Sequence, residues 1–149
     1  MIFAEEIVAR ILLRWPIARL ALLDERSEPR QLPIVFACAE GALWSPVDGK
    51  AKRSADLARL DRLARHPRVS LLLDEYAEDW SRLWWLELRG QAEVVRAEIE
   101  TEPRIAAAAA ALRAKYPQYA STPLFLGPPT LLRITPESAR GWAASKEAP

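Results

Sequence analysis

Apolar and polar residues alternate from Trp84 to Val94, and this alternation predicts a β-strand with two unlike faces. Every second residue from Trp84 onward is apolar or glycine, whereas the intervening positions from Glu87 to Glu93 are charged or polar. A period of two is typical of a strand with one buried face. Trp85 breaks the pattern because it lies at the head of the polar face. We therefore expect another chain, a ligand or both to cover Trp85.

The same kind of pattern predicts the other elements of the chain. Apolar runs bounded by turn residues predict strands over 17–24, 32–39, 42–47, 69–74 and 131–135. Helical spacing of apolar residues predicts helices over 3–13, 54–66 and 101–116, with Ser54 and Thr101 as their N-caps in the last two. Pro16 and Pro67 end the first two helices.

The connections between these elements predict a mainly β fold. Short turns join the first three predicted strands, so these strands form an antiparallel meander. Helices separate the third strand from the fourth and the fifth from the sixth. We expect a small antiparallel barrel with helices at its ends. It forms a single domain over 1–149, with a frayed tail from about 143 to 149.

Composition narrows the class of protein. The chain has 149 residues and a net charge of +1, which gives no global field toward nucleic acid or membrane. No apolar run approaches the roughly 20 residues of a membrane span, and we see no signal peptide. The only cysteine, Cys38, lies in an apolar run, so we interpret it as a small core residue of a cytoplasmic protein. One histidine and one cysteine leave no zinc constellation.

A basic cluster lies where the third predicted strand leads into a helix. It consists of Lys50, Lys52 and Arg53, followed by Ser54 at the helix start. A helix N-terminus carries unpaired N–H groups and a partial positive charge, so added cations and a hydroxyl favour a phosphate there. The alternative is a solvated basic turn, since no Walker pattern is present.

Two other charged groups of residues favour ordinary surface roles. The arginine-rich end of the helix over 54–66 is interrupted by Asp56 and Asp61, which predicts a salt-bridged face rather than a nucleic-acid site. The acidic stretch from Asp74 to Asp79 lacks a metal-loop glycine, so we interpret it as a charged turn. With only His66 available, no Ser/His/Asp triad can be assembled.

These features together resemble a known superfamily. The order is a short helix, a meander, K-A-K-R-S at a helix start, V-S-L-L-L-D, then D-W-S-R-L-W-W-L-E-L-R-G-Q-A-E-V-V and a C-terminal G-W. The chain resembles the flavin-binding split-barrel superfamily, the pyridoxamine 5′-phosphate oxidase class, from about Glu6 to Trp142. Within it, the chain is most similar to the branch of oxidoreductases that depend on the deazaflavin coenzyme F-420. The resemblance implies a six-stranded antiparallel split β-barrel with flanking helices, and a homodimer with two cofactor sites between its subunits.

The resemblance also implies which positions contact the cofactor. The second strand lines the flavin ring, the third strand adds two residues, and the basic cluster holds the phosphate. Trp85 occupies the position of a polar residue, often glutamine, and the C-terminal Trp142 and Arg140 reach the partner's site. The implied cofactor-binding residues are therefore Pro33, Ile34, Val35, Phe36, Trp44, Ser45, Lys50, Lys52, Arg53, Ser54, Trp85 and Trp142.

Two functions follow from the resemblance. The first is an oxidoreductase that uses FMN or F-420 to transfer a hydride to or from a small conjugated or quinone-like molecule. The second is a non-catalytic protein of the same fold that binds or senses a flavin or haem. The C-terminal segment lacks the histidine with which vitamin B6 oxidases grip their substrate, so pyridoxine phosphate is not the expected substrate. Hydride transfer needs no side-chain acid or base, and we name no catalytic residue.

Overall fold

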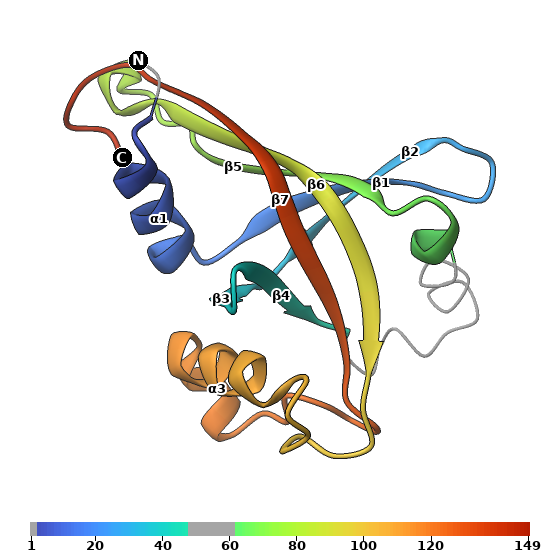
Figure 1. Cartoon of the computed structure of the whole chain (residues 1–149). Coiled ribbons are helices and arrows are strands. Elements are labelled where there is room, and N and C mark those ends of the chain that lie inside the picture. Colours follow the sequence, from blue (N-terminus) through green and yellow to red (C-terminus); the bar gives the residue numbers. More distant parts are fainter. Residues whose placement is uncertain (1–2, 48–61) are drawn as a thin grey trace.

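The computed structural model describes residues 3–47 and 62–149. Seven antiparallel strands form one sheet in the order β2-β1-β5-β6-β7-β4-β3 (Figure 1). Helices α1 and α3 lie beside this sheet, and two short 3₁₀ helices, η2 and η3, lie in the connections. The bounds are α1 Glu5–Arg14, β1 Ala18–Leu23, β2 Pro29–Ile34, β3 Ala37–Ala39, β4 Ala42–Pro46, β5 Arg68–Glu75, η2 Trp80–Arg82, β6 Trp84–Arg96, α3 Ala106–Lys115, η3 Pro117–Ala120 and β7 Thr130–Ala143.

The predicted antiparallel barrel is confirmed as a mainly β fold whose sheet does not close, with seven strands rather than six. The strand predicted over 32–39 is in fact two strands. β2 pairs with β1 at one edge of the sheet, while β3 pairs with β4 at the other. Val35 and Phe36 join the two edges, so the chain itself crosses the opening of the barrel.

The last strand is much longer than the 131–135 predicted. β7 runs for 14 residues and pairs with β6 from Arg96↔Thr130 to Trp84↔Ala143. The sequence P-E-S after Thr135 resembles a loop, but the ladder passes it through a register shift between Arg89 and Gly90. A side chain at Gly90 would place its Cβ 2.1 Å from the carbonyl oxygen of Thr135, so only glycine allows this close approach.

Helix α3 begins at Ala106, five residues after the predicted N-cap Thr101, so that prediction is wrong. Ile105 occupies the N-cap position, and it makes no side-chain capping bond. Ile105 is buried, so the packing of this side chain rather than a polar cap defines the helix start. The predicted α1 is confirmed, with Glu5 and Glu6 in its first turn. Of the helix predicted over 54–66, the described part is helical over 62–65.

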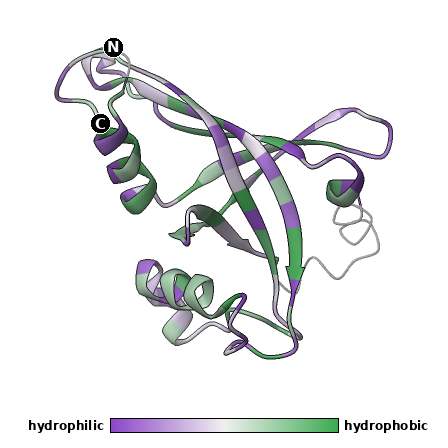
Figure 2. Ribbon diagram, in the orientation of Figure 1, coloured by the Kyte–Doolittle hydropathy of each residue, from purple (hydrophilic) through white to green (hydrophobic). Residues whose placement is uncertain are grey.

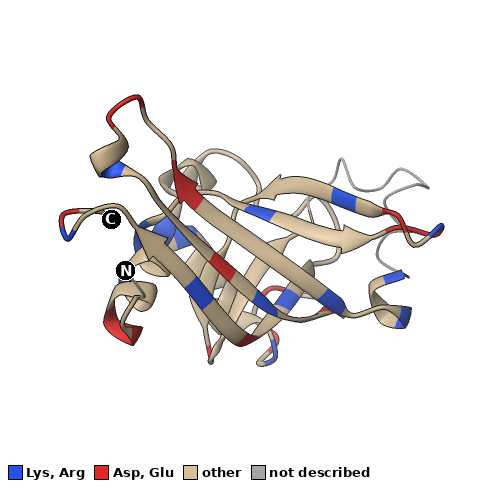
Figure 3. Ribbon diagram, turned by 90° about the horizontal axis from the view of Figure 1, so that it is seen from above, with Lys and Arg blue, Asp and Glu red and all other residues tan. Residues whose placement is uncertain are grey.

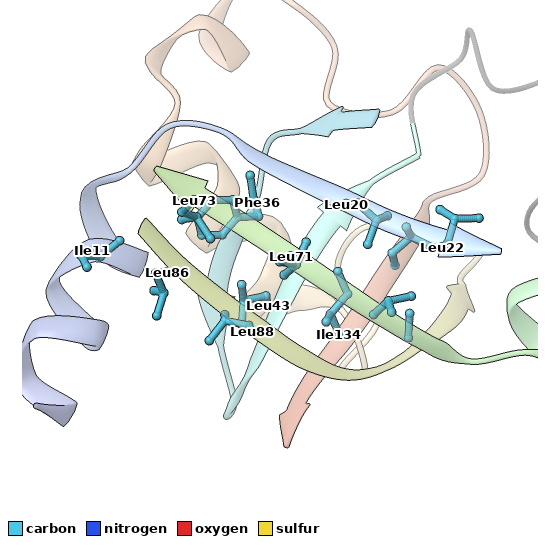
Figure 4. Close-up of a cluster of buried hydrophobic side chains, with 14 of the residues drawn as sticks. Ile11, Leu20, Leu22, Phe36, Leu43, Leu71, Leu73, Leu86, Leu88 and Ile134 are labelled. Atoms are coloured by element: carbon cyan, nitrogen blue, oxygen red, sulfur yellow. The ribbon is translucent and has the colours of Figure 1, made fainter. Parts of the chain in front are cut away.

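Two hydrophobic clusters lie on opposite faces of the sheet. The first fills the barrel interior with side chains from β1, β5, β6 and α1, which point toward one another in Figure 4. It includes Trp84, which is 1% exposed. The second lies between α3 and the sheet, where Leu112 packs with Trp44 and Leu131. Along β6, apolar residues that are buried in the first cluster alternate with more exposed, mostly polar residues on the other face (Figure 2).

The surface has mixed charge, as the near-neutral composition predicts. Acidic and basic residues are interspersed along the described strands, whereas the turn after β5 is acidic (Figure 3). The acidic turn is held by ion pairs, Asp74 with Arg19 and Glu75 with Arg82, each at 2.6 Å. In the described ranges, no helix has the length and apolar character that crossing a membrane requires. The same ranges hold no group of three metal-ligating side chains.

Candidate site at the opening of the barrel

The opening between β2 and β3 is organised by the hydroxyl group of Tyr116. The backbone N–H of Phe36 donates to this oxygen at 2.9 Å. The hydroxyl oxygen also lies 2.8 Å from the carbonyl oxygen of Pro16 and 2.9 Å from that of Phe36, and its single proton can be donated to either. Burial raises the pKa of Tyr116, so the hydroxyl stays protonated. Phe36 therefore has its backbone bonds satisfied without a neighbouring strand.

Lys115 lies beside the same residue. Its Nζ is 3.6 Å from the centroid of the Phe36 ring, and it donates a hydrogen bond to the carbonyl oxygen of Leu12 at 3.1 Å. Desolvation by burial lowers the pKa of Lys115 to about 8, an effect that Cys38 partly opposes. An ammonium in this setting can donate a proton close to neutral pH.

Cys38 is exposed, so its prediction as a core residue is wrong. In β3 the buried side is that of Ala37, and the next residue points to the other side. The surroundings of Cys38 nevertheless raise the pKa of its thiol through desolvation, while Lys115 acts in the opposite direction.

The residues that were predicted to line the flavin ring differ in how far their side chains are exposed to solvent. Pro33 is exposed and Val35 is half-buried, whereas the side chain of Phe36 is completely buried. Trp44 and Ser45 are each 3% exposed, and the indole N–H of Trp44 donates to the carbonyl oxygen of Ala39. Within one chain the buried side chains belong to the core, so a ligand would contact these positions mainly through backbone and through Pro33, Ile34 and Val35. Lys50, Lys52, Arg53 and Ser54 lie outside the described residues.

Trp85 and Trp142 are direct neighbours across β6 and β7. Trp85 is half-buried and Trp142 is 41% exposed, and the guanidinium carbon of Arg140 lies 5.7 Å from the centroid of the Trp85 indole. Residues paired directly across a ladder share a face, so both indoles lie on the outer face of the sheet, and we call these two side chains the aromatic surface. The sequence pattern singled out Trp85 and the family resemblance named Trp142, but neither placed the two residues together.

This aromatic surface is remote from Trp44 within one chain. Trp85 precedes Glu93 by eight residues on β6, and the ladder connects Glu93 through Arg133 to Trp44. Eight residues and two strand spacings amount to about 28 Å along the sheet. Pro33 is nearer to Trp85. Trp85 pairs with Asp74, which lies two residues from Leu72, the ladder partner of Arg19, and Arg19 pairs with Pro33. Three strand spacings and two residues amount to about 16 Å along the sheet.

The described residues match a flavin-like ring in chemical type. Trp85, Trp142 and Arg140 offer aromatic surface and a cationic donor at one place on the chain. Lys115 offers a second cationic donor at the Phe36 opening, which is a separate place in the single chain. The Phe36 opening adds apolar surface.

Comparison with known proteins identifies the family. The family model described as pyridoxamine 5′-phosphate oxidase matches residues 3–143. The chain belongs to the pyridoxamine 5′-phosphate oxidase family. No curated protein matches its sequence.

Solved structures share this family's fold at low identity. A conserved hypothetical protein of Mycobacterium tuberculosis has a TM-score of 0.71 at 20% identity, covering 95% of this chain and 86% of its own. An FAD-binding protein of Mesorhizobium loti has a TM-score of 0.66 at 20% identity, with 95% of each chain covered. The heme storage protein HutZ of Vibrio cholerae has a TM-score of 0.66 at 16% identity, with 93% of each covered. At these identities the likeness establishes the fold.

Sequence reasoning missed Lys115 and Tyr116. Both occur at the end of the alanine-rich helix, where a lysine is usually interpreted as a favourable partner of the helix dipole. The available signal was the K-Y-P sequence, which places a cation and a hydroxyl immediately before the proline that follows the helix. That signal indicates a helix end and does not indicate what the two side chains reach.

Proposed function

We propose that the protein is a homodimeric oxidoreductase that binds FMN or the deazaflavin F-420 between its subunits. It transfers a hydride to or from a small conjugated or quinone-like molecule. The observation that carries the proposal is the aromatic surface of Trp85 and Trp142, which a single chain leaves partly open. A flat ring and a second subunit are the covers that this surface fits best. Membership of the family and the FAD-binding neighbour support the same conclusion.

The chain's own residues divide the binding task. In this proposal Lys50, Lys52, Arg53 and Ser54 hold the phosphate, and the segment 33–36 lies along the ring. Trp85 and Trp142 cover a face of the ring and exclude water from it. The bound cofactor supplies the hydride chemistry. The protein provides orientation, charge and a dry environment.

A direct test is to purify the protein from a host that makes both cofactors and to identify what copurifies by its absorption and mass. Titration of the apoprotein with FMN and with F-420 then gives each affinity. The proposal predicts a dissociation constant below about 100 μM for one of them, roughly −5.5 kcal/mol. If neither cofactor binds more tightly than this, the oxidoreductase proposal fails.

A double variant localises the phosphate. Lys52→Ala with Arg53→Ala removes two charge-assisted contacts and is expected to weaken cofactor binding at least tenfold, with little change in thermal stability. Arg26→Ala with Arg30→Ala, on the β1–β2 hairpin, removes the same charge elsewhere and serves as the control. Equal affinities of the two double variants would move the phosphate site to another part of the chain.

The second candidate is a non-catalytic carrier or sensor of a flavin or haem. The structural likeness to a heme storage protein, over 93% of both chains, supports this second candidate function. Turnover separates the candidates, because a carrier binds its ligand tightly without passing electrons to any acceptor. Haem and flavin titrations followed by assays with quinones and enones therefore distinguish the two functions.

A further inference from the structure

We propose that Lys115 donates a proton to the oxygen atom of the substrate that becomes negatively charged when the hydride arrives. The inference rests on the proposed function and adds to it a catalytic residue. It comes from the position of the lysine at the opening between β2 and β3.

Among the residues that the structure describes, the carbonyl oxygen of Leu12 is the one hydrogen-bond acceptor that Lys115 reaches. Lys115 ends α3, and instead of bonding the last carbonyls of its own helix, it reaches the carbonyl oxygen of Leu12 in α1. One side of Nζ lies over the Phe36 ring, which accepts no conventional hydrogen bond. An ammonium has three N–H donors, and Leu12 takes one of them. A substrate oxygen beside Val35 and Phe36 would take another.

Lys115 also lies next to the segment that is proposed to line the flavin ring. Phe36 belongs to the segment that the resemblance places along the flavin, and Lys115 contacts its side chain directly. A substrate lying against the ring in this region would have its polar end near Nζ. Lys115 is half-buried rather than buried, and Cys38 on the neighbouring strand β3 is exposed.

The chemical step balances with the proposed cofactor as the reductant. The β-carbon of the unsaturated substrate gains a hydride, with its electron pair, from reduced FMN or F-420. A C–H bond forms, the C=C π bond breaks, and the electrons move to oxygen as an enolate. That oxygen takes a proton from the ammonium of Lys115, which is then reprotonated from solvent. For a quinone the hydride and the proton yield the hydroquinone, and in each case two electrons are transferred.

The charged surroundings suit a proton donor. β3 contributes Cys38, whose ionised form would hold the proton on Lys115, and α1 contributes the uncharged carbonyl of Leu12. Tyr116, the next residue, keeps its proton because burial raises its pKa. Within the described ranges, no carboxylate contributes to the change in the pKa of Lys115. The pKa of Lys115, about 8, makes it both protonated and acidic near neutral pH.

Binding of a phenolate tests the role without turnover. The probe is 4-hydroxybenzaldehyde, whose absorption reports whether it is bound ionised, added to the cofactor-loaded protein. We expect the wild type to bind the phenolate at least tenfold more tightly than Lys115→Met, since a charge-assisted hydrogen bond is lost. Lys115→Arg keeps the cation and should retain the affinity. Lys146→Met, in the C-terminal tail, is the matched control and should behave as the wild type.

The pH dependence of turnover separates proton donation from simple positioning. With 1,4-naphthoquinone as substrate, the wild-type rate should fall as pH rises through about 8. Lys115→Arg, which binds the probe but cannot lose its proton in this range, should be slower at pH 7 and lack that fall. The same pH profile in wild type and Lys115→Arg, or equal probe affinity in wild type and Lys115→Met, would overturn the inference.

The outcomes separate this inference from the proposed function. If the wild type binds neither FMN nor F-420, the proposed function itself fails. If cofactor binds and quinones are reduced equally by wild type and Lys115→Met, only the role of Lys115 fails. Should Lys115→Met not fold, Lys115→Arg carries the test alone through its pH profile.

Discussion

The hydroxyl oxygen of Tyr116 lies 2.9 Å from the backbone nitrogen of Phe36, 80 positions earlier in the chain, and this contact holds the break between β2 and β3. A side chain thus replaces the strand that would otherwise pair with Phe36. Because the same oxygen lies near the carbonyl of Pro16, it connects the break to the segment between α1 and β1.

Tyr116→Phe should therefore destabilise the protein by about 2 kcal/mol. The substitution keeps the ring and its packing but leaves the buried N–H of Phe36 without its acceptor. Urea unfolding of wild type and variant measures the difference. Tyr76→Phe is the control, since Tyr76 is 74% exposed and its loss of a hydroxyl should change stability little. Equal stability of the two variants would show that water replaces Tyr116 at this site.

The same contact explains why the sequence predicted one strand over 32–39. L-P-I-V-F-A-C-A is apolar throughout and contains no turn signal after Pro33. The break between β2 and β3 depends on Tyr116, which is distant in the sequence, and local strand propensity cannot indicate such a partner. Strands that have proline or turn residues at their ends, such as β1 after Pro16 and β4 after Glu40-Gly41, were predicted to within one residue.

The sequence also failed to predict the full length of β7 and the position of the aromatic surface, because both depend on residues far apart in the chain. P-E-S after Thr135 has the composition of a loop, and the ladder through it depends on Gly90 in β6. The alternation pattern singled out Trp85, and the family resemblance named Trp142. Only the register of β6 against β7 places them side by side.

Gly90→Ala tests this register directly. Its new Cβ would lie 2.1 Å from a backbone oxygen, that of Thr135, so one strand must move. We expect a loss of about 3 kcal/mol in the free energy of unfolding. At Gly141 the added Cβ would instead meet the ring of Phe3, a side chain that can shift, so Gly141→Ala should cost about 1 kcal/mol. Thermal or urea unfolding ranks the two, and the reverse order would contradict the close approach of the strands.

Trp85→Ala examines the aromatic surface. The substitution removes the indole that lies beside Trp142 and under Arg140, and we expect both dimerisation and cofactor affinity to weaken at least tenfold. Analytical ultracentrifugation and fluorescence titration measure the two effects. Trp80→Ala is the matched control, because Trp80 is 68% exposed on the separate turn η2. If Trp85→Ala still forms a stable dimer and binds the cofactor with unchanged affinity, then Trp85 has no role in dimerisation or cofactor binding.

Lys115 should give the folded protein a distinctive dependence on pH. Burial lowers its pKa from the ordinary 10.5 to about 8, so below pH 8 both the folded and the unfolded chain carry the proton. In that range the folded state bears the full cost of burying the charge. Between pH 8 and 10.5 the folded state has released the proton while the unfolded state keeps it, so stability rises with pH.

The expected rise is about 1 kcal/mol, reduced from the full linkage value because the ammonium is only partly buried. Cys38 and Tyr116 act in the opposite direction, since their pKa values are raised and the unfolded chain ionises first. The measurement is therefore the difference in unfolding free energy between wild type and Lys115→Met at pH 7, 8 and 9, repeated in a Cys38→Ser background. The difference should shift in favour of the wild type as pH rises, and more strongly without Cys38, whose charge holds the proton on the lysine. A difference that stays constant with pH would mean that Lys115 is solvated like a surface lysine, with its proton bound throughout this range.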